Sequence, residues 1–244
     1  MLGACSGAGR SASHAAPAPT TAATTATTTA TGSGSGSEQG PAKFVAHGPR
    51  ETNRVAFTFH GSGDVGLLHA LLAAAQRAAV PVTVFAVGSW VDEHPEVVSA
   101  ILGAGHELAN HTYTHPALGQ EAAAMVADEI VRCRDALARH AGSPGAWFRP
   151  SGVELPSALI LAEAGRAGYR TVVGYDVDPR DYEDPPAATI LERVRGGLQP
   201  GAVVSLHTGH ANTVAAFEPM VAAARERSLT PVLVRDLLAR QSPP

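Results

Sequence analysis

The stretch Pro81-Val-Thr-Val-Phe-Ala-Val-Gly-Ser-Trp90 opens the part of the sequence that decides the fold. Its β-branched run, residues 81–87, predicts a buried strand, and the apolar pattern at 95–103, which opens on a proline, predicts a helix. A second short apolar run follows at 106–109. A strand, a helix and a strand in this order are typical of a parallel sheet with helical crossovers.

The same alternation of short apolar runs and alanine-rich helical patterns extends in both directions along the chain. The expected strands are residues 55–59, 81–87, 106–109, 146–149, 169–174, 202–206 and 230–232. The expected helices are residues 65–79, 95–103, 120–140, 156–167, 186–196, 213–228 and 234–240. Strands this short, each followed by one helix, predict a small α/β barrel related to the (β/α)8 design. A doubly wound open sheet is the alternative, although no Gly-x-Gly-x-x-Gly follows the first strand.

Composition excludes several classes of protein. The chain has 244 residues, of which 45% are hydrophobic and 16% charged, and its net charge is −4. This balance argues against a nucleic-acid partner, and no apolar run reaches the roughly 20 residues of a membrane-spanning helix. The two cysteines, Cys5 and Cys133, are too few for a disulfide framework or a thiolate zinc cluster.

Residues 11–40 differ in composition from the rest of the chain. They consist almost entirely of Ala, Thr, Ser, Gly and Pro, and Glu38 carries their only formal charge. A segment with no large apolar side chain cannot form a core, so we expect a disordered linker. The folded domain is therefore predicted to span residues 41–244.

Residues 1–10 contain a possible lipidation signal. Leu2-Gly-Ala-Cys5 resembles a bacterial lipobox, but the apolar segment that should precede it is missing. Either this is the remnant of a lipoprotein signal whose true start lies upstream, or the match is due to chance. We expect the first, with Cys5 as a lipid anchor, the only membrane attachment, on an extracytoplasmic protein; a secreted or a cytoplasmic protein is the alternative.

Polar residues gather where the expected strands end. In a parallel barrel these ends meet on one face, where active sites are built. The residues are His60 and Asp64, His111 and His115, Arg149, Asp178 and Asp181, and His207. His111 and His115 are four residues apart, which is one face of a helical turn, and such a pair can bind one Zn²⁺.

Several motifs in order resemble those of the polysaccharide deacetylases, the NodB-homology enzymes of carbohydrate esterase family 4. They are Asn110-His-Thr-Tyr-Thr-His115, Phe148-Arg-Pro150, Asp178-Pro-Arg-Asp181-Tyr182 and Val203-Val-Ser-Leu-His207. The resemblance covers about residues 52–240 and implies a distorted (β/α)7 barrel. It also implies a metal-dependent hydrolase that removes acetyl groups from the amino sugars of chitin-like or peptidoglycan chains.

The resemblance assigns roles by motif position. His111 and His115 would be metal ligands, most simply for Zn²⁺, with Co²⁺ or Ni²⁺ as alternatives. His207 would be the general acid, Asp181 would tune it, and Arg149 would orient the base. The substrate pocket would be lined by Tyr182, Pro150 and Leu206.

The first motif departs from the family pattern. The family has Thr-Phe-Asp-Asp-Gly, whose aspartates serve as base and metal ligand, whereas this chain reads Thr58-Phe-His-Gly-Ser-Gly-Asp64. Asp64 could reach back as the third metal ligand while His60 serves as base, which is the reading that we adopt. Alternatively, His60 is the ligand and Asp64 the base, or the site has decayed. The glycines around Ser62 would permit a rerouted loop.

These observations predict a monomeric, metal-dependent deacetylase of an acetylated cell-envelope or extracellular glycan, with an N-acetyl or O-acetyl target. Two alternatives stay open. One is a catalytically impaired glycan-binding lipoprotein on the same barrel, and the other is an amidase with a non-glycan substrate.

Overall fold

The computed structural model describes residues 40–239. The predicted lipidation site Cys5 and residues 11–39 of the predicted linker lie outside this range. Within it, no helix combines the length and the apolar character that a membrane span requires.

All strand pairs of the described residues are parallel. The strands are β1 (Lys43–Val45), β2 (Arg54–Gly61), β3 (Thr83–Ala86), β4 (Glu107–Asn110), β5 (Thr171–Val173), β6 (Val203–His207) and β7 (Thr230–Pro231). The order is β4-β3-β2-β6, with β7 beside the start of β2 and β1 paired with β5. Single bridges at Phe148 join β4 to β5, and a bridge at Val177 joins the chain after β5 to β6. The strands thus form a distorted α/β barrel, as predicted.

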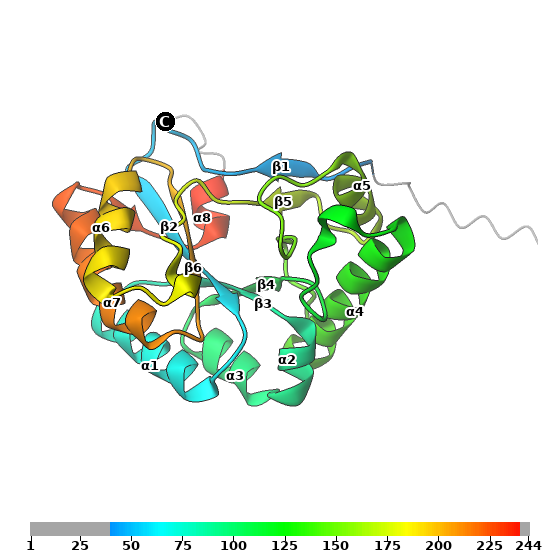
Figure 1. The fold of residues 1–244 in the computed structure, drawn as a ribbon, viewed down its shortest axis with the longest axis horizontal. Helices are drawn as coiled ribbons and strands as arrows, with labels where there is room; N and C mark the ends of the chain where they lie inside the picture. Colours follow the sequence, from blue (N-terminus) through cyan, green and yellow to red (C-terminus); the bar gives the residue numbers. More distant parts are fainter. Residues whose placement is uncertain (1–39, 240–244) are drawn as a thin grey trace, which may run out of the picture. The chain divides into compact units, whose positions relative to one another are not determined.

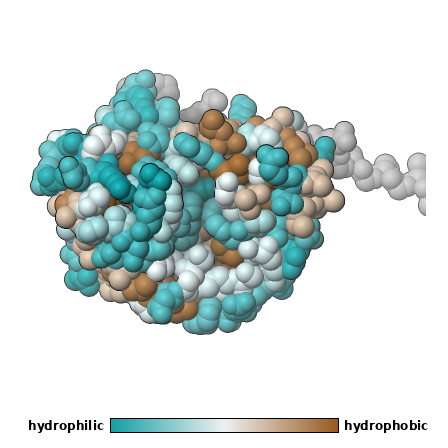
Figure 2. Space-filling view, viewed as in Figure 1, coloured by the Kyte–Doolittle hydropathy of each residue, from teal (hydrophilic) through white to brown (hydrophobic). Residues whose placement is uncertain are grey.

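The helices form an outer layer around these strands (Figure 1). They are α1 (Val65–Arg77), α2 (Gly88–Glu93), α3 (Glu96–Gly103), α4 (Ala123–Ala141), α5 (Ala158–Arg166), α6 (Ala187–Gly197), α7 (Ala211–Glu226) and α8 (Val234–Leu238). Two short 3-10 turns, Leu118–Gln120 and Asp181–Glu183, complete the elements. The face seen in Figure 2 is largely hydrophilic, and its apolar patches are scattered.

Alternation along β2 separates the core from the site. Phe57 and Phe59 are fully buried beneath the helices, where each ring lies 5.7 Å from that of Phe217 in α7. Successive side chains of a strand point to opposite faces, so Thr58 and His60 lie on the other side, inside the barrel. The same strand therefore anchors the helical layer and delivers His60 to the barrel mouth.

The structure corrects three expectations. Residues 146–149 form only a bridge at Phe148, because Gly145 has a positive φ of 74° and Pro150 cannot donate a backbone hydrogen bond. The sequence reasoning missed β1 and α2. Residues 111–115 form no helical turn, since Thr112 and His115 adopt left-handed φ angles of 66° and 61°. The other expected elements are present, with small shifts at their ends.

Candidate active site

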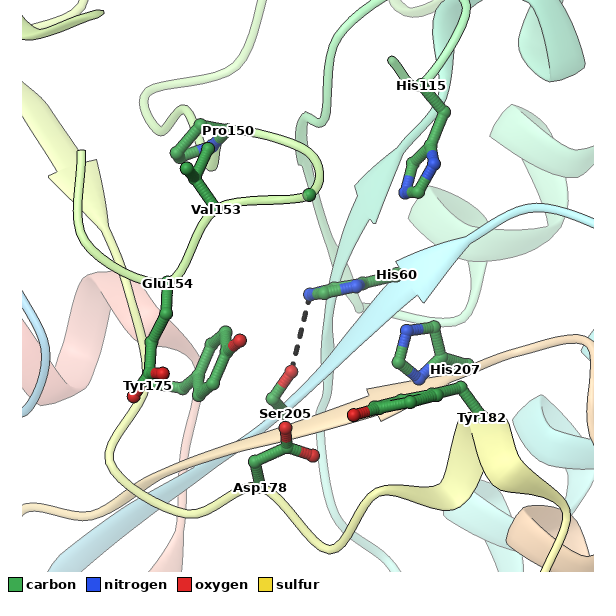
Figure 3. A pocket seen from close by; sticks show the side chains of 11 residues that line it. His60, His115, Pro150, Val153, Glu154, Tyr175, Asp178, Tyr182, Ser205 and His207 are labelled. Carbon is green, nitrogen blue, oxygen red and sulfur yellow. Dashed lines mark hydrogen bonds between the residues drawn. The ribbon is translucent and has the colours of Figure 1, made fainter. Parts of the chain in front are cut away.

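A cleft of about 470 Å³ lies at the carboxyl ends of the strands (Figure 3). It collects side chains that are far apart in the sequence. Its walls are formed by His60, His115, Pro150, Gly152, Val153, Glu154, Tyr175, Asp178, Tyr182, Ser205 and His207. The sequence reasoning singled out six of these residues by role or by strand-end position, so the cleft is where most of the predicted site residues meet.

Four imidazoles form one cluster at this cleft. The ring centroid of His60 lies 4.2 Å from that of His111 and 4.5 Å from that of His207. The rings of His111 and His115 are 4.9 Å apart. His60 and His207 are brought together by the register of β2 and β6, in which they are direct partners. The cluster therefore follows from strand pairing as much as from the loops.

His111 has one ring nitrogen that lacks a partner. Nδ1 lies 2.9 Å from the carbonyl oxygen of Arg149, to which it donates, so Nε2 carries a lone pair. This Nε2 atom is buried and has no hydrogen-bond partner among residues 40–239. Burial, with His115 nearby, holds the pKa of His111 well below its usual range, so the ring is neutral. A neutral imidazole whose far nitrogen is fixed by a carbonyl is the usual form of a metal-binding histidine.

A buried carboxylate on α4 holds the loop between the two histidines. Glu129 is 2% exposed and accepts hydrogen bonds from the backbone amides of Tyr113 and Thr114, both at 2.8 Å. It also accepts one from the Thr114 hydroxyl at 2.6 Å. These bonds stabilise the left-handed residues on either side, Thr112 and His115, whose conformations are unfavourable for non-glycine residues. The two histidines of the His-x-x-x-His motif are thus brought together by a loop that Glu129 holds in place, and not by a helical turn.

Asp181 forms a hydrogen-bonded pair with His207, the member of the imidazole cluster that lies on β6. Oδ1 of the fully buried Asp181 lies 2.8 Å from Nδ1 of His207. Its Oδ2 accepts from the backbone N–H of His207 at 2.8 Å and from the Thr213 hydroxyl at 2.7 Å. Because Nδ1 of His207 is bonded to Asp181, Nε2 is the nitrogen that is available to a molecule in the cleft.

His60 and Asp64, the two candidates from the altered first motif, are separated. His60 lies in the cluster, and burial and the neighbouring imidazoles hold its pKa well below the usual value. Asp64 is exposed and caps α1, where its carboxylate accepts from the backbone N–H of Leu67 at 2.9 Å. The structure therefore does not bring Asp64 to His111 and His115.

Arg149 is buried among backbone groups. Its guanidinium donates to the carbonyls of Val173 at 3.0 Å and Gly174 at 2.9 Å, and to the Thr58 hydroxyl at 2.9 Å. It also lies 4.1 Å from the ring centroid of Phe85. Burial lowers its pKa to about 9. These contacts place a positive charge beneath the cleft without a hydrogen bond to His60.

Two of the three predicted substrate-binding residues lie in the cleft, and the third lies in the core. Pro150 and Tyr182 line the cleft, and the Tyr182 ring lies 5.5 Å from that of His207. Leu206 is fully buried in the core because its side chain points away from the cleft, which Ser205 lines instead. Sequence reasoning gave no role to Tyr175 or Glu154. Tyr175 follows a predicted strand, and that position was the signal available for it.

The residues partly fit a divalent metal ion. Among the described residues, no three His, Cys, Asp or Glu side chains are arranged to hold one. Two features nonetheless suit such an ion, namely the free buried Nε2 of His111 and the proximity of the His115 ring. Imidazole nitrogen is a preferred ligand of Zn²⁺ and its neighbours in the first transition series.

The buried neutral imidazoles predict acid sensitivity of the metal-free protein. The native pKa values of His60 and His111 lie below the unfolded value of about 6.5, so below that pH the unfolded chain binds more protons. The free energy of unfolding should therefore fall as the pH decreases from about 7.5 to about 5. Urea unfolding of chelator-treated protein at a series of pH values measures this slope. His60→Gln should flatten it, whereas exchange of the exposed His69 for Gln should not; equal slopes in all three proteins would contradict the interpretation.

Comparison with known proteins gives consistent similarities. The family model described as polysaccharide deacetylase matches residues 47–172. A chitooligosaccharide deacetylase of Bradyrhizobium sp. is 35% identical over 170 residues, which cover 66% of this chain and 68% of the relative. A peptidoglycan-N-acetylglucosamine deacetylase of Bacillus cereus is 27% identical over 194 residues, with 78% and 90% covered.

A solved structure shares the fold. The crystal structure of a CE4 family pseudoenzyme from Bacillus anthracis superposes with a TM-score of 0.76 at 22% identity, covering 81% of this chain and 69% of the other. At this identity the likeness concerns the architecture of the barrel.

Proposed function

Because the chain belongs to the polysaccharide deacetylase family, we propose that it hydrolyses acetyl groups from a glycan that contains N-acetylglucosamine. Relatives named as deacetylases of chitooligosaccharide and of peptidoglycan N-acetylglucosamine support this substrate class. The observation that carries the proposal is the pair formed by His207 and the buried Asp181, in which the His207 ring also lies 4.5 Å from that of His60.

In this mechanism, each side chain has a part that follows from its contacts. His207, held by Asp181, protonates the leaving amine from its free nitrogen. His60, on the adjacent strand, accepts the proton of the attacking water. Pro150 and Tyr182 form the walls against which the acetyl group and sugar would lie.

Family members are generally dependent on a divalent metal, and we assign the ion here to His111 and His115. When bound, it supplies positive charge that polarises the acetyl carbonyl and acidifies water. Zn²⁺ is our first candidate, and Co²⁺ or Ni²⁺ would suit the same nitrogen ligands. Asp64 would have to leave its helix cap to join them.

A second candidate function is glycan binding without turnover. Gly61 stands where the family has its metal-binding aspartate, so the ligand set has lost a carboxylate. A barrel that kept the cleft but bound no metal would still hold an acetylated glycan. The Bacillus anthracis protein of the same fold, which is named a pseudoenzyme, supports this second candidate.

We also propose that the protein acts outside the cytoplasm, as a monomer held to the membrane through Cys5. Peptidoglycan, the substrate in the name of the Bacillus cereus relative, is a cell-wall glycan, which supports this location.

Metal removal tests the proposed function. Acetate release from N-acetyl chitooligosaccharide and from peptidoglycan should disappear after chelation and return with Zn²⁺ or Co²⁺. His111→Ala should abolish both metal binding, measured by calorimetry, and acetate release, because it removes the buried Nε2. His69→Ala, on the exposed face of α1, is the matched control. Glycan binding with no acetate release under any metal would favour the second candidate.

A further inference from the structure

Ser205 and His60 form a hydrogen-bonded pair inside the cleft. The Ser205 Oγ atom lies 3.3 Å from Nε2 of His60, across the β2–β6 pairing (Figure 3). Ser205 is only 2% exposed, yet it lines the cleft. Within residues 40–239, its hydroxyl has no other hydrogen-bond partner. A buried hydroxyl whose one hydrogen bond is to an imidazole is a candidate nucleophile, with the imidazole as its base.

The register of the two strands explains this pair. Thr58 is the direct partner of Ser205, and His60 is the direct partner of His207, so all four face the cleft side. The Thr58 hydroxyl is already occupied, since it donates to the Val204 carbonyl at 2.7 Å and accepts from Arg149. Of the two hydroxyl groups at this pairing of β2 and β6, only that of Ser205 is therefore available to bond with His60.

We propose that Ser205 is a nucleophile activated by His60, and that the cleft hydrolyses O-acetyl esters through an acetyl-Ser205 intermediate without a metal ion. Oγ of Ser205 bonds to the acetyl carbonyl carbon as its proton passes to Nε2 of His60. The bond between this carbon and the ester oxygen then breaks, and the leaving alcohol takes its proton from His60, which is neutral again. Water attacks the acetyl-serine, His60 takes its proton and returns it to Oγ, and acetic acid is released.

Neighbouring side chains can stabilise the oxyanion and the leaving alcohol of this reaction. The Tyr175 hydroxyl points into the space in front of His60 (Figure 3), where it can donate to the developing oxyanion. The buried Arg149 guanidinium lies 5.4 Å from the Tyr175 ring and adds positive charge below it. The His207 ring, 4.5 Å from that of His60, is placed beside the leaving alcohol. An ester is the expected substrate because an alcohol leaves more readily than an amine.

This route shares its cleft with the proposed deacetylation but is independent of metal binding. It assigns His60 the role of base in both reactions and adds Ser205 to one of them. The two reactions can therefore be separated by a variant that lacks the serine hydroxyl.

The test uses chelator-treated full-length protein and 4-nitrophenyl acetate as the ester. Rapid mixing should show a burst of nitrophenolate, and acid-quenched protein should carry one acetyl group that peptide mass mapping places on Ser205. Ser205→Ala and His60→Gln should each slow acylation by about 100-fold or more. Ser62→Ala, in the turn that follows β2, should react as wild type. Ser205→Cys should still be acylated, as a thioester, which shows that position 205 tolerates change.

Three outcomes would overturn the proposal: wild-type protein that forms no acetyl adduct, an adduct that maps to another residue, or Ser205→Ala protein that is acylated like wild type. None of them bears on the metal-dependent reaction. Acetate release from N-acetyl chitooligosaccharide by Zn²⁺-loaded Ser205→Ala protein tests that reaction separately, so failure of one proposal is distinguishable from failure of the other.

Discussion

Replacement of Asp181 by asparagine is expected to lower the kcat of acetate release by about 10²- to 10⁴-fold. The carboxylate fixes the orientation of the His207 ring through Nδ1, and it stabilises the positive charge that the ring carries during proton transfer. An asparagine can keep the bond from the His207 backbone N–H but has no negative charge. The loss should fall on kcat more than on KM, because the pair acts on the leaving amine. His207→Ala should lose as much.

Two controls separate this effect from misfolding. His210→Ala removes a ring 6.0 Å from that of His207 but outside its bond to Asp181, and it should retain activity. Urea unfolding of each variant shows whether the fold is kept. Asp181→Asn protein that is folded and fully active would remove the catalytic role of the pair.

Restoring the second aspartate of the family motif is expected to destabilise this chain. Gly61→Asp should lower the free energy of unfolding by about 3 kcal/mol or more, and it should not increase metal affinity. A Cβ atom on Gly61 would lie 2.7 Å from Cγ1 of Val84 and 3.2 Å from Cα of Ala86. The new carboxylate would be forced among apolar side chains of β3 and would not face the histidine cluster.

A double-mutant cycle measures this overlap. Val84→Ala alone should be destabilising, yet in combination with Gly61→Asp it should recover part of the lost stability, because it removes the methyl group nearest to the new Cβ. Calorimetric Zn²⁺ titration of the same four proteins reports metal affinity. A single Gly61→Asp variant that is as stable as wild type and binds Zn²⁺ more tightly would show that the strand can rearrange.

The barrel was predictable because its signal is repeated. Apolar runs, proline-started helices and polar residues at strand ends recur along the chain, so an error at one element does not change the architecture. The strand expected at 146–149 failed locally, since Gly145 and Pro150 limit pairing to Phe148. Three residues of β1 are too short to give a periodic pattern at all.

The site was harder to predict because it depends on side-chain direction. Ordered motifs singled out His111, His115 and His207, whose rings lie in one cluster, and Asp181 lies at hydrogen-bond distance from His207. A motif does not show, however, which residues of a strand point into the cleft and which point into the core. Leu206 was expected in the substrate pocket, but the alternation of β6 puts Ser205 there. The sequence shows that Asp64 lies close to the altered motif. It does not show that the Asp64 carboxylate caps the first turn of α1, because that depends on the local backbone conformation.

The clamp formed by Glu129 has a consequence for any attempt to move this site to another scaffold. Grafting the five residues from His111 to His115 would transfer the two histidines and the left-handed conformations of Thr112 and His115 without the carboxylate that stabilises their loop. The smallest transferable module is therefore the loop together with α4, held at the distance at which Glu129 reaches both amides.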